Sequence, residues 1–120
     1  MHFVKIALII AGNAFALWVA NKYVPGFVLN ATLLQLIVIG LLLSLLNFIV
    51  KPLLVLILGP IILLTLGLGV IIVNAIIIYI LPILADHLDI LHGSIRIETI
   101  PALLFATLIV SAINFLIHLI

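Results

Sequence analysis

Hydrophobic residues form long runs along the chain, and the polar residues gather in short stretches between them. A helix needs about 20 consecutive apolar residues to cross a bilayer. The runs therefore predict four membrane-spanning helices, at about residues 6–24, 32–50, 61–81 and 100–119. Proline supports several of these limits, because it disfavours helix at the residue before it and suits a first helical turn. Pro25 and Pro82 stand at two expected ends, and Pro60 stands at an expected beginning.

The second and third runs are separated by Lys51-Pro52, within an otherwise uncharged tract. At the end of a span, a lysine can lay its stem in the apolar layer while its ammonium reaches water. Residues 52–59 are too few to cross, because as a helix they reach only about 12 Å of a core about 30 Å thick. We therefore expect a short interfacial or re-entrant segment there. The alternative is one kinked helix from Thr32 to Leu58.

The most polar stretch covers residues 85–98, and we expect it outside the membrane. Apolar and polar residues alternate on both sides of His92-Gly93, which is the spacing of two strands around a turn. The pattern predicts a small extramembrane hairpin. Its alternating apolar residues are Leu88, Ile90, Ile95 and Ile97.

Two parts of the sequence resemble each other. Residues 41–51, LLLSLLNFIVK, share Leu, Ser, Asn and Phe with residues 108–118, LIVSAINFLIH, and Lys51 falls on His118. We therefore expect one all-α transmembrane domain over residues 1–120, built from two similar helical hairpins with the interfacial segment between them. An even number of spans separates equivalent helices, so the repeats are expected to be parallel, around an axis along the membrane normal.

Polar residues inside the spans are the candidate functional groups. The second expected span carries a stripe of small and polar residues at helical spacing, at positions 40, 44, 47 and 51, and the fourth repeats it at 107, 111, 114 and 118. The first stripe ends in Lys51 and the second in His118. Such residues hydrogen-bond across helix contacts for about 0.6–2 kcal/mol each, so packing is the first interpretation. A polar pathway through one protomer or an oligomer is the alternative. The residues in question are Asn13, Ser44, Asn47, Asn74, Thr107, Ser111 and Asn114.

Other residues suggest how the helices are placed. Trp18 and Tyr79 lie toward the ends of their spans, where aromatic residues anchor helices at the interface. Gly67 and Gly69 are two residues apart, which is not the spacing of a GxxxG dimer motif, so we expect a kink or a close helix contact. The residues that we interpret as markers of topology are Lys51, Pro52, Pro60 and His118.

Composition narrows the class of protein. Hydrophobic residues make up 69% of the chain and charged residues 6%, against about 25% charged in soluble domains, so this is an integral membrane protein in contact with the lipid bilayer. A net charge of +1 gives no reason to expect a nucleic-acid partner. The absence of cysteine excludes thiol chemistry.

The polar stretch also holds four side chains that are able to bind metals. Their spacing matches no zinc or calcium pattern, and no nucleophile is paired with a base. We expect neither metal, cofactor nor enzymatic activity. The four residues are Asp86, His87, Asp89 and His92.

Charge gives a weak indication of orientation. An even number of spans places both termini on one side, together with Lys5 and Lys51, whereas Lys22 and Arg96 lie on the other. Lysine and arginine are therefore balanced, and acidic residues contribute little to orientation. The amino group and the histidines favour both termini in the cytoplasm.

The central block resembles a known family. LLN before Lys51, VKP at residues 50–52, LTLGL at 64–68 and NA at 74–75 are similar to the four-helix proteins of the phage-holin superfamily IV type, over nearly the whole chain. In the second loop His92-Gly93 replaces the Pro-Gly-Phe of the first. The positions that match the family's recurring residues are Asn47, Lys51, Pro52, Pro60, Thr65, Gly67 and Asn74.

The resemblance implies a small multi-pass protein of the bacterial inner membrane, holin-like and oligomeric. Its expected role is membrane permeabilisation or envelope integrity. A different interpretation is a structural protein that binds a membrane or envelope partner through residues 85–98 without forming a pore. A small channel or carrier is a further alternative, although the spans hold no acidic residue of the kind that carriers commonly place there.

Overall fold

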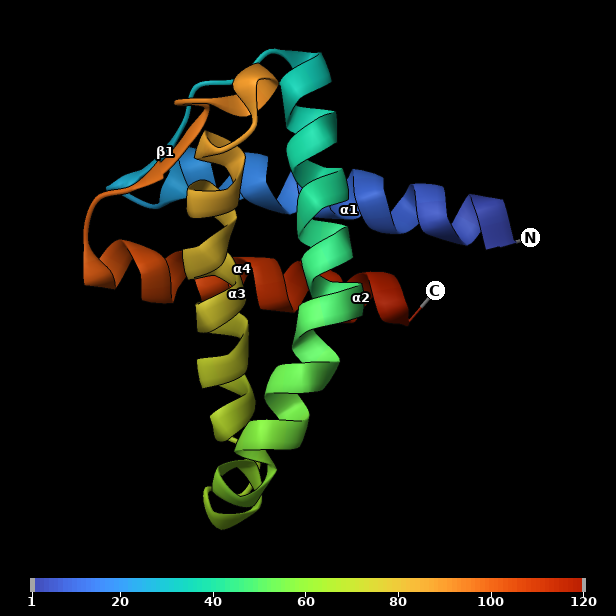
Figure 1. Ribbon diagram of the computed structural model, residues 1–120, viewed down its shortest axis with the longest axis vertical. Coiled ribbons are helices and arrows are strands. Elements are labelled where there is room, and N and C mark those ends of the chain that lie inside the picture. Colours follow the sequence, from blue (N-terminus) through green and yellow to red (C-terminus); the bar gives the residue numbers. More distant parts are fainter. Residues whose placement is uncertain (1, 120) are drawn as a thin grey trace.

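The computed structural model describes residues 2–119 and contains four long helices. They are α1 (His2–Tyr23), α2 (Leu33–Leu64), α3 (Gly69–Asp86) and α4 (Ile100–His118). Each is long and apolar enough to cross a membrane, as the hydrophobic runs predict. α1 and α4 run antiparallel to each other and cross α2 and α3, which are also antiparallel (Figure 1).

The core lies where the helices meet. Gly40 lets α1 and α2 approach closely, because a Cβ atom at this position would lie 2.8 Å from the carbonyl oxygen of Ile10. Many large apolar side chains instead point outward, as expected for helices solvated by lipid tails. The largest buried core side chains on α1, α2 and α3 include Leu17, Ile39, Leu43, Ile77 and Leu81.

α2 differs from the expected second span. It does not end at Val50 but continues through Pro52 and Pro60, so the third long helix begins at Gly69 and not near residue 61. A proline inside a helix removes one N–H donor. Transmembrane helices tolerate this loss because neighbouring groups satisfy the freed carbonyl. α2 bends toward the start of α3 in its second half (Figure 1), which fits the usual effect of proline.

Helix α2, which contains residues 52–59, is longer than a straight helix needs to be to cross the bilayer. At about 1.5 Å per residue, the 32 residues of α2 extend about 48 Å, against a hydrocarbon core of about 30 Å. The part from Leu33 to Val50 alone is nearly long enough to cross. The interfacial position of residues 52–59 therefore stays a prediction, now for the second half of a continuous helix.

The turn between α2 and α3 depends on a threonine and a glycine. The Thr65 hydroxyl donates to the carbonyl of Ile61 (2.8 Å) and accepts from the N–H of Gly69 (2.9 Å), so one side chain joins the two helix ends. Gly67 has a φ of +94°, which glycine adopts without steric cost. A Cβ at Gly69 would lie 3.0 Å from the Cα of Ile62, so α3 begins in close contact with α2.

The expected hairpin within residues 85–98 is wrong. Ile95–Ile97 does form a strand, β2, but it pairs antiparallel with β1 (Phe27–Leu29) of the first loop. The preceding residues form a short 3₁₀ helix, η1 (Asp89–Leu91), with Leu91 fully buried. Alternation along one segment predicts a strand but does not specify its partner.

The two loops repeat the same local bonds at an offset of 67 residues (24 to 91, 27 to 94). The N–H of Phe27 donates to the carbonyl of Val24, as that of Ser94 does to Leu91. The glycines between them, Gly26 and Gly93, have φ values of +90° and +73°. Both following helices begin with a threonine cap, at residues 32 and 99.

Candidate functional site

The first polar pair joins α1 to α2. The Asn13 amide donates to the Ser44 hydroxyl (2.7 Å), which in turn donates to the carbonyl of Gly40 (2.7 Å). Asn13 is fully buried, and its Oδ1 atom has no hydrogen-bond partner within residues 2–119. This pair connects the two helices inside the core.

An equivalent pair joins α3 to α4. The Asn74 amide donates to the Ser111 hydroxyl (3.1 Å), and both residues lie in the aligned positions of Asn13 and Ser44. Unlike the first pair, this one borders an open space. Both pairs therefore join two helices, and the pair between α3 and α4 also lines a cavity.

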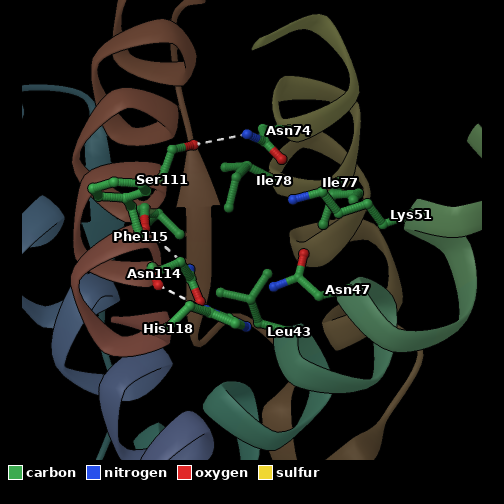
Figure 2. Close-up of a pocket in the computed structure, with 11 residues that line it drawn as sticks. Leu43, Asn47, Lys51, Asn74, Ile77, Ile78, Ser111, Asn114, Phe115 and His118 are labelled. Atoms are coloured by element: carbon green, nitrogen blue, oxygen red, sulfur yellow. Dashed lines mark hydrogen bonds between the residues drawn. The ribbon is translucent and has the colours of Figure 1, made fainter. Parts of the chain in front are cut away.

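The cavity lies between α2, α3 and α4 and has a volume of about 400 Å³ (Figure 2). Leu43, Ile77 and Phe115 belong to its apolar wall. Asn47 and Lys51 of α2 meet Asn114 and His118 of α4 across it, so the two sequence stripes share one space. The polar groups that line it are Asn47, Lys51, Asn74, Ser111, Asn114 and His118.

The charge in this cavity is positive. Lys51 is partly buried and extends from α2 into the space between Asn47 and Asn74 (Figure 2). Among residues 2–119, no acidic side chain lines the cavity. The His118 ring donates from Nδ1 to the carbonyl of Asn114 (2.8 Å), since a carbonyl only accepts, and this leaves Nε2 available.

The chain combines four long apolar helices with the Lys-Pro and LTLGL segments. Residues 4–116 match the family described as "Mycobacterial 4 TMS phage holin, superfamily IV", in which TMS denotes transmembrane segments. The chain belongs to this holin family. It is therefore a multi-pass membrane protein, and the resemblance seen in the sequence is confirmed. Among curated proteins and solved structures, none matches it.

The threonine, prolines and glycines that the sequence analysis singles out lie outside the cavity of this holin-family chain. Thr107 is buried, and its hydroxyl donates to the carbonyl of Leu103 (2.7 Å). Pro52 and Pro60 lie along α2, and Gly67 and Gly69 lie at the turn before α3. None of these five residues lines the cavity.

The two aromatic residues expected at the membrane interface, Trp18 on α1 and Tyr79 on α3, are both exposed. Trp18 is 44% exposed and Tyr79 is 59% exposed. The Lys22 ammonium lies 5.2 Å from the centre of the Trp18 ring, at the end of α1. Such a pair suits the boundary between lipid and water, although the depth of both residues stays a prediction.

The acidic and histidine side chains of the second loop mainly shape that loop. Asp86 accepts from the N–H of Gly93 (3.0 Å), and the ring of His92 bonds the carbonyl of Asp86 (3.0 Å). The His87 ring bonds the carbonyl of Ile83 (2.7 Å). These bonds give Asp86, His87 and His92 local structural roles.

Sequence reasoning did not predict that the two stripes would enclose one cavity. The signal was present, because the stripes on α2 and α4 have the same spacing and the same kind of basic end group. What it lacked was the relative position of the two helices. The apolar wall, with Leu43 and Ile77, gave no signal because such residues fill every span.

Proposed function

We propose that this holin-family protein forms homo-oligomers in the bacterial inner membrane and permeabilises it without catalysing a reaction. The observation that carries the proposal is the polar cavity among apolar helices. Intramembrane polar groups that face such a space commonly mark a path for water or solutes. Packing alone does not account for Asn47 and Lys51, because neither side chain makes a hydrogen bond with another described residue.

The proposed architecture is two parallel hairpins related by a local two-fold axis along the membrane normal. The two asparagine–serine bonds support it, since Asn13–Ser44 and Asn74–Ser111 occupy aligned positions. The β ribbon supports it as well. Under the offset of 67 residues, the pair Val28–Arg96 corresponds to the pair Leu29–Ile95, as a two-fold axis between the strands requires.

The proposed orientation places both termini in the cytoplasm. In Figure 1 both termini lie on the side of the molecule away from the β ribbon. The ribbon carries Arg96 and Glu98, which form an exposed ion pair (2.9 Å). Lys5 on α1 and Lys51 on α2 are balanced by Lys22 and Arg96 on the ribbon side, so the amino group, His2 and His118 support this orientation.

Release of a trapped dye from liposomes tests permeabilisation. The purified protein should release dye in proportion to its ratio to lipid, with oligomers verified by cross-linking. Asn47→Leu should reduce release, because it replaces a polar group of the cavity with an apolar one. Tyr79→Phe is the control, since it removes a polar group outside that cavity. No release from liposomes that contain oligomers would refute the proposal.

A second candidate function is binding of a membrane or envelope protein through residues 85–98. One observation favours it: Leu88 is 42% exposed and Ile90 is 51% exposed on a segment outside the long helices. Leu91 and β2 hold the rest of the loop in place, so point variants are preferable to a deletion. Leu88→Ser combined with Ile90→Ser should abolish cross-linking to the partner, and unchanged cross-linking would exclude this surface.

A further inference from the structure

The charge balance of the cavity indicates an anionic ligand. Lys51 brings a positive charge into a partly buried space, and the acidic residues of the chain, Asp86, Asp89 and Glu98, all lie on or next to the second loop. Within residues 2–119, Lys51 has no ion-pair partner. A charge removed from water without a partner is costly. A bound anion would offset that cost.

Two further hydrogen-bond donors of the cavity are also unused. In the first half, the Ser44 hydroxyl gives its proton to the carbonyl of Gly40. The equivalent Ser111 hydroxyl accepts from Asn74, but among the described residues it donates to none. The amide of Asn47 is likewise unpaired there. The cavity therefore contains an ammonium, a hydroxyl and an amide that are available as donors.

The cavity is confined to one half of the molecule for a structural reason. At the corresponding place in the first half, Gly40 brings α2 against α1, and Ile117 of α4 fills the space beside Gly12. In the second half, Thr107 stands at the position of Gly40 and Val73 at that of Gly12. Larger residues at both places are consistent with the wider separation that leaves room beside Asn74 and Ser111.

We infer that the cavity between α2, α3 and α4 binds the phosphate group of an anionic ligand, held by Lys51, Asn47 and Ser111. Phosphate oxygens accept several hydrogen bonds at once, and lysine serves as a point charge for them. A volume of about 400 Å³ is within the range of small-ligand sites. The phosphate could belong to a lipid headgroup or to a soluble phosphate, because the recognising groups are the same.

Native mass spectrometry of the detergent-solubilised full chain tests the inference. Phosphatidylglycerol and neutral diacylglycerol form the lipid arm, and inorganic phosphate forms the soluble arm. The wild type should retain one phosphatidylglycerol per chain in preference to diacylglycerol, or bind inorganic phosphate. The arm that shows binding identifies the source of the phosphate.

Substitutions connect binding to this cavity. Lys51→Gln should weaken binding about tenfold to a hundredfold, because it removes a charged hydrogen-bond donor. Lys51→Arg should restore most of the affinity. Lys22→Gln is the matched control, since it removes one charge at the other end of the helical domain, outside the cavity. Circular dichroism verifies that each variant is folded.

The inference is overturned if Lys51→Gln and Lys22→Gln weaken binding equally. It is also overturned if inorganic phosphate does not bind and phosphatidylglycerol is retained no better than diacylglycerol. It is independent of permeabilisation, because retention is measured without a sealed membrane. A protein that releases dye but retains no phosphate ligand would contradict only this inference. A protein that binds the ligand but releases no dye would contradict only the proposed function.

Discussion

At the scale of single residues, similar side chains have different surroundings. Asn13 is fully buried and bonds Ser44, whereas Asn74 bonds Ser111 at the edge of a cavity. A buried amide that loses its partner cannot be hydrated, so its desolvation is uncompensated. Among the described residues, one oxygen of Asn13 already has no partner, which makes its remaining bond important for stability.

We therefore expect Ser44→Ala to destabilise the protein more than Ser111→Ala. The loss should be about 1–2 kcal/mol for Ser44→Ala and below about 1 kcal/mol for Ser111→Ala, because water in the cavity can replace the second partner. The free energy of unfolding in mixed detergent micelles measures both. A double-mutant cycle with Asn13→Ala isolates the first bond, and equal losses for the two serine variants would contradict the prediction.

At the scale of elements, the prolines of α2 explain the largest difference from the sequence-based boundaries. Pro52 and Pro60 are typical of helix ends in soluble proteins, yet here one helix contains both. The apolar runs correctly predicted four long helices, since few other elements bury so much apolar surface in lipid. The turn at Thr65 and Gly67 was missed, because the limits were placed at the prolines and not at a segment whose glycine has positive φ.

The second loop shows a different limit of sequence reasoning. Alternation correctly indicated a strand around Ile95 and Ile97, but the partner strand lies far away in the chain, at residues 27–29. Local periodicity contains no information about such distant pairing. The spacing of the polar residues on α2 and α4 predicts that each set shares one helix face. It does not predict which helix packs against that face, so the shared cavity could not be predicted.

Glycine substitutions separate the turn from the helix. Gly67→Ala should destabilise by about 1–2 kcal/mol, because Gly67 has positive φ and a Cβ is unfavourable in that region. Gly59→Ala is the matched control: Gly59 lies inside α2 with nothing within 4 Å of an added Cβ. This control should stabilise by about 0.5–1 kcal/mol. Thermal unfolding in detergent compares them, and the same sign for both variants would exclude this account of the turn.

Residues 52–59 are expected at the membrane interface even though they are helical. The chain has no cysteine, so single thiols are easily introduced. Val55→Cys should react with a water-soluble maleimide in intact proteoliposomes much faster than Leu41→Cys. The two parent side chains are equally exposed on the same helix, at 39% and 41%, so the comparison reports depth in the membrane and not packing. Equal, slow labelling would place Val55 in the lipid core.

At the scale of the whole molecule, the β ribbon connects the two proposed hairpins. β1 follows α1, and β2 follows α3, so their pairing links elements that lie far apart in the sequence. The Gln35 side chain adds a bond from α2 to the carbonyl of Ile90 (2.9 Å). Together these contacts hold the two loops on one side of the helices and fix how the halves face each other.

A disulfide scan distinguishes this ribbon from a hairpin local to the second loop. Leu29→Cys with Ile95→Cys should form a disulfide rapidly under mild oxidation, because the two residues are directly opposite in the antiparallel register. Ile90→Cys with Ile95→Cys is the matched pair, since these positions would be opposite in a hairpin turning at His92-Gly93. In the structure Ile90 is exposed and Ile95 is buried, so their thiols should react slowly. Gel mobility after proteolysis between the two cysteines measures how fast each disulfide forms. Faster oxidation of the second pair would show that the local hairpin forms and that the two loops are not paired with each other.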